Sequence, residues 1–510
     1  MNIHFNKALA LVFFLIVTVG MMAKNTNNLR FDVQKFTQQT ISYQGQTMKV
    51  RAYENIEYVQ RPVDTAYQKM NIYIPEAYFE SKTINGYTAQ SAPIFFPNKV
   101  GGYMPAKPAS LSDNPMGMRP PINGEMPSAN AMPSLPNPQL ESKPLTIVVA
   151  LMRGYVVASA GARGRTLSNA DGAFTGKAPA GLVDLKAAIR YLKYNNKRMP
   201  GDATKLVSNG TSAGGAMSAL LGATANNPVY EPYLKELGAA KASDAVFAVS
   251  AYCPITNLEH ADMAYEWQFN GINSYTKGGP MARPNAAPQL LTEAQIKVSN
   301  ELKTLFPAYL NSLDLRNKQG NMLRLDAQGN GNFKELIASY IIASAQKELD
   351  HGADLSKLSF LTIADKKVIA LDYEKYIHYI GRQKTPPAFD ALDLSSPETN
   401  LFGTSSISNQ HFTDYSQKNS IVNGTRVDEA IVRMMNPMNF VGAPKTTTAN
   451  HWRIRHGASD KDTSFAIAVM LATLLENRGF DVNLELPWGK AHSGDYDLNE
   501  LFDWVDALCK

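Results

Sequence analysis

The feature that most constrains the fold is a regular alternation of short apolar segments with segments of helical period. Residues 154–158 and 205–208 have the apolar character of short strands. Between them lies an amphipathic segment, residues 182–194, whose apolar side chains recur at helical spacing. A helix of small residues is expected over 213–223, and another strand over 245–250. Strands that alternate with helices form a mostly parallel sheet with helices on both faces, so the sequence predicts an α/β fold.

The alternation stops near residue 254 and resumes near residue 437. The stretch between these positions is rich in predicted helix and in polar loops. An earlier strand and an earlier helix are expected at 68–75 and 145–151, and the resumed pattern predicts two strands and two helices at 452–456, 464–478, 482–486 and 498–508. The simplest organisation is one core, formed by residues 24–253 and 437–510, with a large helical lid or cap inserted at 254–436.

Residues 1–23 have the order of a secretory signal peptide. Lys7 precedes an apolar run over residues 8–23, and polar residues follow at once. A retained membrane anchor is the alternative, but the run is shorter than the ~20 residues needed to cross a bilayer. The sequence therefore predicts an exported protein, periplasmic or extracellular, with no stable membrane span after cleavage.

Composition and charge exclude several classes of protein. With 44% hydrophobic and 19% charged residues, the chain can bury a sizeable core. The net charge of the chain is +5, and its basic residues form no block typical of a nucleic-acid partner.

Residues 105–143 are rich in Pro, Met, Asn and Ser, which predicts an exposed loop inserted into the fold. Cys253 and Cys509 are expected to be free or buried thiols, with a single disulfide as the alternative.

The segment Gly210-Thr211-Ser212-Ala213-Gly214 fits the pattern G-x-S-x-G, which places a nucleophilic serine on a strained turn between a strand and a helix. Small residues are needed on both sides, because a side chain there would crowd the neighbouring backbone. The alternative is an ordinary glycine-rich turn with a solvated serine. The predicted strand before the motif and the predicted helix after it favour Ser212 as a nucleophile of the α/β-hydrolase type.

A serine nucleophile needs a base oriented by an acid, and in this fold the acid and then the histidine follow the serine in the chain. His492 lies between the last predicted strand and the last predicted helix, which is the expected place for the base. His451 and His456 bracket a predicted strand and are as well explained by structural roles. Asp460 and Asp462 compete as the acid, since both follow the preceding strand, and Asp462 could instead cap a helix. Asp495 is a weaker candidate.

Negative charge on the substrate oxygen requires two preorganised backbone donors. The N–H of Ala213, directly after the nucleophile, is one candidate. The other usually comes from a glycine-rich turn after an early strand, and Gly102 in Gly101-Gly102-Tyr103 is the best match. An unremarkable glycine turn is the alternative for this second donor. No metal or organic cofactor is needed for such chemistry.

The ordered set of motifs closely resembles one family, the bacterial tannases, tannin acyl hydrolases of the lid-containing subtype B. The resemblance rests on six segments: FFPNKVGGYMP, GLVDLKAAIRYLKYN, SNGTSAGGAMSALLGA, KTPPAFDALDL, RHGASDKDTSF and LPWGKAHSGDYDL. It implies a triad of Ser212, Asp460 and His492, which decides between the two aspartates. It also implies that Lys384, Glu398 and Asp462 bind the hydroxyls of a gallate ring.

The resemblance implies a secreted serine esterase whose partners are small polyphenol esters and whose reaction releases gallic acid and an alcohol. Thr211 and Ala491 stand where fungal tannases and feruloyl esterases carry cysteines, which places the chain with the bacterial type. The loop at 105–143 is longer than the family pattern suggests. A feruloyl or other carboxylic esterase of the same fold is the alternative function, and a non-catalytic phenolic-binding protein is a remote one.

Overall fold

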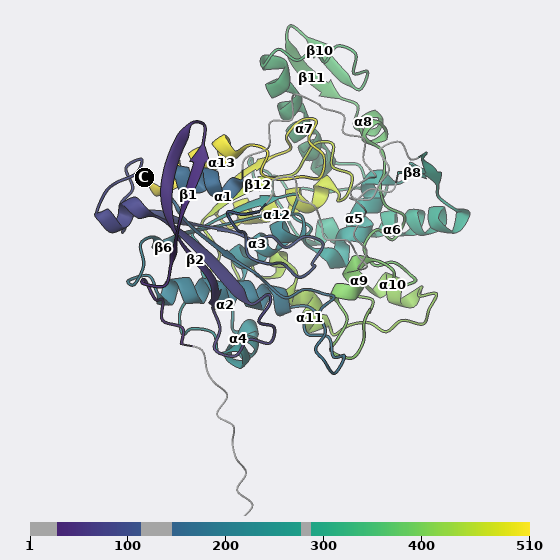
Figure 1. Cartoon of the computed structure of the whole chain (residues 1–510). Helices are drawn as coiled ribbons and strands as arrows, with labels where there is room; N and C mark the ends of the chain where they lie inside the picture. The colour runs from purple at the N-terminus through teal and green to yellow at the C-terminus, as the bar shows by residue number, and fades with distance from the viewer. Residues whose placement is uncertain (1–27, 114–144, 277–286) are drawn as a thin grey trace, which may run out of the picture.

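The computed structural model describes residues 28–113, 145–276 and 287–510. The largest element of the described structure is a mixed sheet with helices around it (Figure 1). The sheet has nine strands in the described chain, in the order β1-β2-β3-β5-β4-β6-β7-β12-β13. The strands are β1 (Thr37–Tyr43), β2 (Gln46–Glu57), β3 (Lys69–Pro75), β4 (Pro93–Pro97), β5 (Val156–Ala160), β6 (Asp202–Thr211), β7 (Ala248–Tyr252), β12 (His451–Arg455) and β13 (Asp481–Glu485).

The sheet changes direction at β5. From β1 to β5 each neighbouring pair is antiparallel, whereas β5, β4, β6, β7, β12 and β13 are all parallel. Every residue of β4, β5 and β7 is buried, as expected for strands covered on both faces. Because the carboxyl ends of parallel strands share one edge, the loops after β6, β7, β12 and β13 meet there. This architecture confirms the predicted α/β-hydrolase fold.

Helices cover both faces of the sheet. α1 packs against α13, and α2 packs against α3 and α4; in Figure 1 the pair α1 and α13 lies on one side of the sheet and α2 and α4 on the other. The bounds of these helices are α1 (Thr146–Met152), α2 (Ala180–Tyr194), α3 (Ala213–Ala223), α4 (Glu231–Leu237), α12 (Phe465–Asn477) and α13 (Leu498–Cys509), with short 3₁₀ turns η1 (Glu76–Glu80), η2 (Pro228–Tyr230) and η3 (Pro437–Asn439).

The described residues from 254 to 436 add no strand to the large sheet, and we call this stretch the inserted region. It occupies the teal-to-green part of Figure 1, at the right and top. Its elements are α5 (Leu258–Phe269), β8 (Ser274–Tyr275), β9 (Gln289–Leu290), α6 (Glu293–Ser312), α7 (Asn332–Asp350), β10 (Leu361–Ala364), β11 (Lys367–Leu371), α8 (Tyr373–Ile380), α9 (Pro397–Leu401), α10 (Asp414–Lys418) and α11 (Glu429–Met434). The hairpin β10–β11 was not predicted.

Most predicted elements of the core are confirmed, and three points need correction. The strand expected at 154–158 begins at Val156, because Gly154 turns the chain with a φ of 90°. The strand expected at 245–250 is shifted to Ala248–Tyr252, where it pairs with β6 and β12. The β1–β2 hairpin was missed: its turn, Gln44-Gly45, has positive φ at both residues without the usual Asn-Gly signature.

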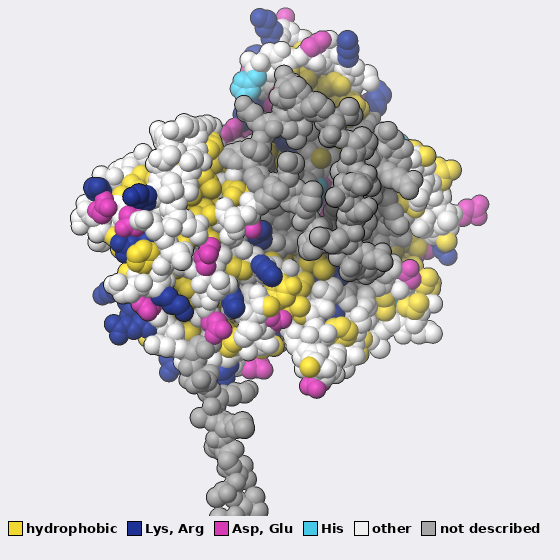
Figure 2. Space-filling view, in the orientation of Figure 1, with side chains coloured by type: hydrophobic (Ala, Val, Ile, Leu, Met, Phe, Trp, Pro, Cys, Tyr) yellow, Lys and Arg dark blue, Asp and Glu magenta, His cyan; other side chains and the backbone are white. Residues whose placement is uncertain are grey.

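One large hydrophobic cluster includes residues of the sheet, its helices and the inserted region, and a small second cluster in the inserted region consists of Ala345, Leu355 and Val368. Cys253 and Cys509 are buried and free, as predicted. Acidic and basic side chains are interspersed over the visible described surface (Figure 2), in line with the small net charge. No helix in the described ranges is long and apolar enough to cross a membrane. The predicted signal peptide, and residues 114–143 of the predicted loop, lie outside the described residues.

Candidate active site

Ser212 occupies a strained turn between the end of β6 and the start of α3. Its backbone has φ 61° and ψ −123°, a combination that L-residues rarely adopt and that costs about 1–3 kcal/mol. A Cβ on Gly210 would lie 2.3 Å from the carbonyl oxygen of Gly214, and one on Gly214 would lie 2.7 Å from Oδ1 of Asn98. The two glycines of the motif are therefore required by the close approach of the backbone. The N–H of Ala213 belongs to the first turn of α3, which has no acceptor within the helix.

Asn98, directly after β4, ties this turn to the neighbouring strand. Its Nδ2 donates to the carbonyl oxygens of Asn209 (3.1 Å) and Gly214 (3.0 Å). Sequence reasoning missed Asn98, although it stands inside a segment that carries the family resemblance. Four residues further on, Gly102 has a φ of 55°, and its carbonyl oxygen accepts a hydrogen bond from Nε of Arg165 at 2.9 Å. This turn is the predicted second site of the oxyanion hole.

His492 and Asp460 form a hydrogen-bonded pair at the carboxyl edge of the sheet. Nδ1 of His492 lies 2.8 Å from Oδ2 of Asp460, whose side chain is fully buried. Burial alone would lower the pKa of His492, but the charge of Asp460 and the hydrogen bonds to Asp460 and Cys253 together outweigh it and raise that pKa. Burial alone would raise the pKa of Asp460, but His456 and His492 hold it well below its usual value. An ionised Asp460 can only accept, so Nδ1–H donates and Nε2 is the nitrogen that can take a proton.

The histidine loop packs against the turn that carries Ser212. A Cβ on Gly494, two residues after His492, would lie 1.9 Å from Oγ1 of Thr211. The N–H of Ser212 donates to the carbonyl oxygen of Tyr252 at 2.9 Å, and the next residue, Cys253, has its Sγ 3.4 Å from the carbonyl oxygen of Ser493. The predicted nucleophile and the predicted base are thus brought to one edge of the sheet.

Two of the competing candidates, Asp495 and His451, have partners other than Asp460 and His492, whereas His456 lies beside Asp460. Asp495 accepts hydrogen bonds from Oγ1 of Thr146 (2.7 Å) and Nδ2 of Asn209 (3.0 Å). His451 stands at the first residue of β12, at the opposite edge of the sheet from the strand ends, and pairs with Asp481. His456 is fully buried, with Nε2 3.6 Å from Oδ2 of Asp460, and burial lowers its pKa.

Cys253, Asp460 and His492 offer ligand atoms that all lie within 4.8 Å of one another. Burial raises the pKa of the Cys253 thiol, which disfavours the thiolate that a metal ion would need. The carboxylate of Asp460 is already hydrogen-bonded to His492. This donor set suits a protonated thiol beside an aspartate–histidine pair better than a metal centre.

Lys384 forms an ion pair with Asp462, which stands two residues after Asp460 in the chain, and Glu398 lies close enough for its charge to act on both. Nζ of Lys384 lies 3.1 Å from Oδ2 of Asp462 and 4.0 Å from the ring centroid of Phe389. Burial would lower the pKa of Lys384, but the charges of Asp462 and then Glu398 outweigh it and raise that pKa. Burial raises the pKa of Glu398 against the opposing charge of Lys384. Nε2 of Gln383, which was not predicted, also donates to Asp462 at 3.1 Å.

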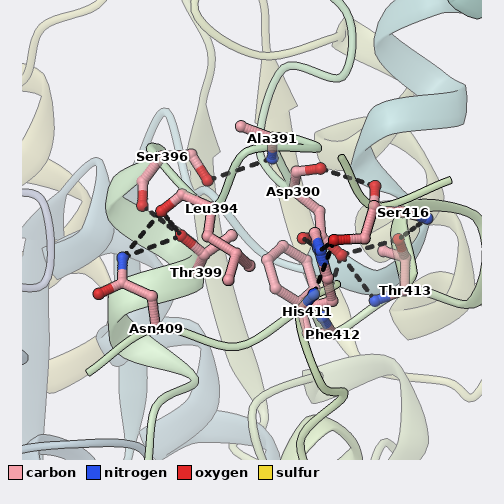
Figure 3. A network of polar contacts seen from close by, with 12 residues as sticks. Asp390, Ala391, Leu394, Ser396, Thr399, Asn409, His411, Phe412, Thr413 and Ser416 are labelled. Atoms are coloured by element: carbon pink, nitrogen blue, oxygen red, sulfur yellow. Dashed lines mark hydrogen bonds and ion pairs between the residues drawn. The ribbon is translucent and has the colours of Figure 1, made fainter. Parts of the chain in front are cut away.

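A buried polar network holds the short helix α9, which carries Glu398, against the segment that follows Lys384 (Figure 3). Oγ of Ser396 donates to the carbonyl oxygen of Phe389, and Oγ1 of Thr399 donates to that of Leu394 at 2.8 Å. The carboxylate of Asp390 anchors the other side of the network through the ring of His411 (2.7 Å) and the backbone N–H groups of Phe412 (2.9 Å) and Thr413 (2.8 Å). Hydrogen bonds on both sides of the network therefore connect the segment that follows Lys384 with α9 and with His411.

Comparison with known proteins gives one consistent answer. A family model described as BD-FAE matches residues 140–300. Esterase LipC of Mycobacterium tuberculosis is 39% identical over 71 residues, which span 14% of this chain and 17% of that esterase. Much longer matches are found among solved structures.

The tannase of Fusobacterium nucleatum superposes with a TM-score of 0.86 at 47% identity, covering 95% of this chain and 100% of that one. The tannin acyl hydrolase of Lactobacillus plantarum superposes with a TM-score of 0.85 at 44% identity, covering 94% and 99% of the two chains. A tannin acyl hydrolase in complex with ethyl gallate matches at 44% identity with a TM-score of 0.84, covering 94% and 99%. Identity at this level over nearly the whole length of both chains shows that the protein belongs to the tannase family and is a carboxylic ester hydrolase.

Proposed function

We propose that this enzyme hydrolyses galloyl esters, both alkyl gallates and hydrolysable tannins, to gallic acid and an alcohol. The observation that carries the proposal is the cluster of Lys384, Asp462 and Glu398 beside the pair of Asp460 and His492. Phenolic hydroxyls are good donors and carboxylates are strong acceptors, while an ammonium group donates to a phenolic oxygen. The related structures named as complexes with ethyl gallate and 3,4-dihydroxybenzoate support this substrate class.

In the proposed reaction, Oγ of Ser212 attacks the ester carbonyl carbon while Nε2 of His492 takes the hydroxyl proton. Asp460 holds the imidazole through Nδ1 and stabilises the imidazolium that forms. The N–H groups of Ala213 and Gly102 stabilise the oxyanion of the tetrahedral intermediate. When the C–O bond breaks, the imidazolium gives its proton to the leaving alcohol, and the acyl group remains on Ser212.

Water then completes the cycle. His492 removes a proton from a water molecule as its oxygen attacks the acyl carbon, and Ser212 leaves with the proton returned from the imidazolium. The products are gallic acid and the free enzyme, so the scheme balances without a metal or an organic cofactor. Lys384 and Glu398 lie in the inserted region, so in this scheme that region, residues 254–436, acts as a lid that completes the acyl pocket.

Export of the enzyme is part of the proposal. The order of charged, apolar and small residues over residues 1–23 supports a cleaved signal peptide. A hydrolysable tannin is a bulky ester that an exported enzyme can meet outside the cytoplasm. The mature enzyme is therefore expected in the periplasm or the medium.

The test compares kcat/KM for methyl gallate, methyl ferulate and p-nitrophenyl acetate. We expect kcat/KM to be highest for methyl gallate by orders of magnitude, since a site whose polar groups match the ring hydroxyls rejects acyl groups that lack them.

Ser212→Ala should lower kcat by about 10⁶-fold on every ester. Lys384→Met should lower kcat/KM for methyl gallate by about 10- to 100-fold and spare the acetate. If the ferulate or the acetate leads, the galloyl assignment fails while the nucleophile assignment stands.

A further inference from the structure

One face of α5 presents three buried polar side chains to a single segment of the inserted region. Tyr265 and Glu266 follow Asp262 by three and four residues, so both lie on the side of the helix that carries Asp262. All three side chains are buried, and Tyr265 is 0% exposed. The segment they meet runs from residue 382 to residue 390 and carries Lys384.

The three side chains hold this segment at its start, its middle and its end. Glu266 forms an ion pair with Arg382, and both side chains are 0% exposed. At the far end, Asp262 accepts hydrogen bonds from the N–H groups of Phe389 (2.7 Å) and Asp390 (3.1 Å). Between these anchors, the segment is fixed by the phenol of Tyr265.

The phenol oxygen of Tyr265 joins two loops that are far apart in the sequence. It accepts hydrogen bonds from the N–H groups of Gln383 (3.1 Å) and Lys384 (3.0 Å). Its own proton is donated to the carbonyl oxygen of Lys461 at 2.9 Å. Lys461 stands between Asp460, which hydrogen-bonds His492, and Asp462, which pairs with Lys384.

A phenol has one proton and two lone pairs, and here all three are used. The oxygen therefore admits one arrangement of the two loops, and any displacement of Lys384 relative to Lys461 breaks at least one buried hydrogen bond. The ring itself is held separately, by packing against Phe269 (ring centroids 4.6 Å apart) and Phe389 (6.3 Å apart). Removing the hydroxyl alone therefore tests the hydrogen bonds between the two loops while leaving the packing of the ring in place.

We propose that Tyr265 is a positioning residue that sets the Lys384 backbone in register with the Asp460–Asp462 loop, so that the acyl-recognition groups and the acid of the triad keep one geometry. This inference rests on the proposed function and deepens it. Tyr265 does not touch the reacting atoms. It acts through Lys384, whose backbone it holds at a fixed position relative to the loop that carries the two aspartates.

The experiment uses Tyr265→Phe, which keeps the ring and removes the hydroxyl. We expect kcat/KM for methyl gallate to fall by about 10- to 100-fold, because a misplacement of about 1 Å costs that much. The same constant for p-nitrophenyl acetate, which has no ring hydroxyls, should fall several-fold less. Tyr230→Phe is the matched control: Tyr230 is also 0% exposed and donates to a backbone carbonyl, that of Met434, away from the site.

A double-mutant cycle tests the route of the effect. If Tyr265 acts through Lys384, then Tyr265→Phe in a Lys384→Met background should cost little further activity on methyl gallate. Additive losses, or equal losses on both esters, would overturn the inference. If the wild-type enzyme does not prefer methyl gallate, the proposed function is wrong, and this outcome does not depend on the activity of the variant.

A second measurement covers the case in which Tyr265→Phe fails to fold. In the wild-type enzyme, the amides of Gln383 and Lys384 should exchange with deuterium as slowly as the amides inside α5, since both donate to a buried phenol. Fast exchange at these two amides would overturn the inference without any variant.

Discussion

At the scale of single residues, the pKa of His492 depends on two opposing effects, its burial and its interaction with Asp460. Burial lowers the pKa of the imidazole and the adjacent carboxylate raises it, with the carboxylate prevailing. His492 can act as a base only when it is unprotonated. The value of kcat/KM should therefore fall on acidification with an apparent pKa above the ordinary histidine value of about 6.5, and we call this fall the acidic limb of the pH profile. The charge that raises the pKa is also the charge that stabilises the imidazolium during acyl transfer.

Asp460→Asn should move that acidic limb to lower pH. Without the carboxylate, burial dominates and the pKa of His492 falls, so the imidazole stays unprotonated in more acidic solution. The plateau of kcat should drop by about 10⁴-fold, because the amide no longer fixes the tautomer or stabilises the imidazolium. The measurement is the pH profile of kcat/KM for methyl gallate.

Asp462→Asn is the matched control for this profile, since it removes a carboxylate from the same loop. It should weaken methyl gallate turnover relative to p-nitrophenyl acetate while shifting the limb less. An acidic limb that stays in place, or moves to higher pH, in Asp460→Asn would contradict the assignment of the acid.

Individual site residues differ in how well they could be predicted from the sequence. Ser212 and His492 could be predicted from a local motif and from their order in the chain. The choice between Asp460 and Asp462 could not be made from spacing, because the deciding contact is with His492, 32 residues away. Asn98 and Tyr265 were missed because they hydrogen-bond to backbone atoms of distant segments, which leaves no periodic signal.

At the scale of elements, the junction between β6 and α3 is the most constrained part of the molecule. The predicted helix over 213–223 coincides with α3, since small residues and a glycine-flanked turn fix both its type and its start. Strand ends were predicted less well. The position of β7 depends on its register with β6 and β12, which local composition does not encode. The β1–β2 hairpin was missed for another reason, because its turn, Gln44-Gly45, lacks the Asn-Gly signature of a tight hairpin.

Gly214→Ala should damage this junction. The new Cβ would lie 2.7 Å from Oδ1 of Asn98 and 2.8 Å from the carbonyl oxygen of Val100, so the turn and β4 must separate. We expect a loss of about 1–3 kcal/mol in the free energy of unfolding. A fall in kcat should accompany it, because the N–H of Ala213 moves with the turn. Thermal unfolding and steady-state kinetics on p-nitrophenyl acetate measure the two effects.

Gly101→Ala is the control for stability, because a Cβ there meets no atom within 4 Å. It should unfold at the wild-type temperature. A Gly214→Ala enzyme with wild-type stability and kcat would show that the junction tolerates a side chain, against the close approach described above.

At the scale of the whole molecule, the core and the inserted region are joined by one continuous hydrophobic cluster. Periodicity predicted that the α/β pattern would pause and resume, which is a local property of the sequence. It could not predict that α5 would pack against α12 or that its polar face would hold Lys384, because those contacts are long-range. Fold class was thus predictable, whereas the contacts between the inserted region and the core were not.

The shared cluster implies that the two parts unfold together. Trp267 of α5 packs against Phe306 (ring centroids 5.1 Å apart) and Phe333 (6.1 Å apart), and its Nε1 donates to the carbonyl oxygen of Gly329 at 2.9 Å. Trp267→Ala removes this packing deep in the inserted region and should cost about 3–5 kcal/mol. We expect a single calorimetric transition in the wild-type enzyme and in the variant, with the Tm of the variant lower by a few degrees.

Ile421→Ala, at an exposed side chain of the inserted region, is the control and should leave the Tm unchanged. Loss of esterase activity on heating should coincide with the calorimetric transition, because α5 carries both Trp267 and the phenol that registers Lys384 against the Asp460–Asp462 loop. A separate early transition in Trp267→Ala, with the main transition unmoved, would mean that the inserted region melts on its own. The geometry of the acyl pocket would then depend on the local stability of that region, and no longer on the stability of the whole chain.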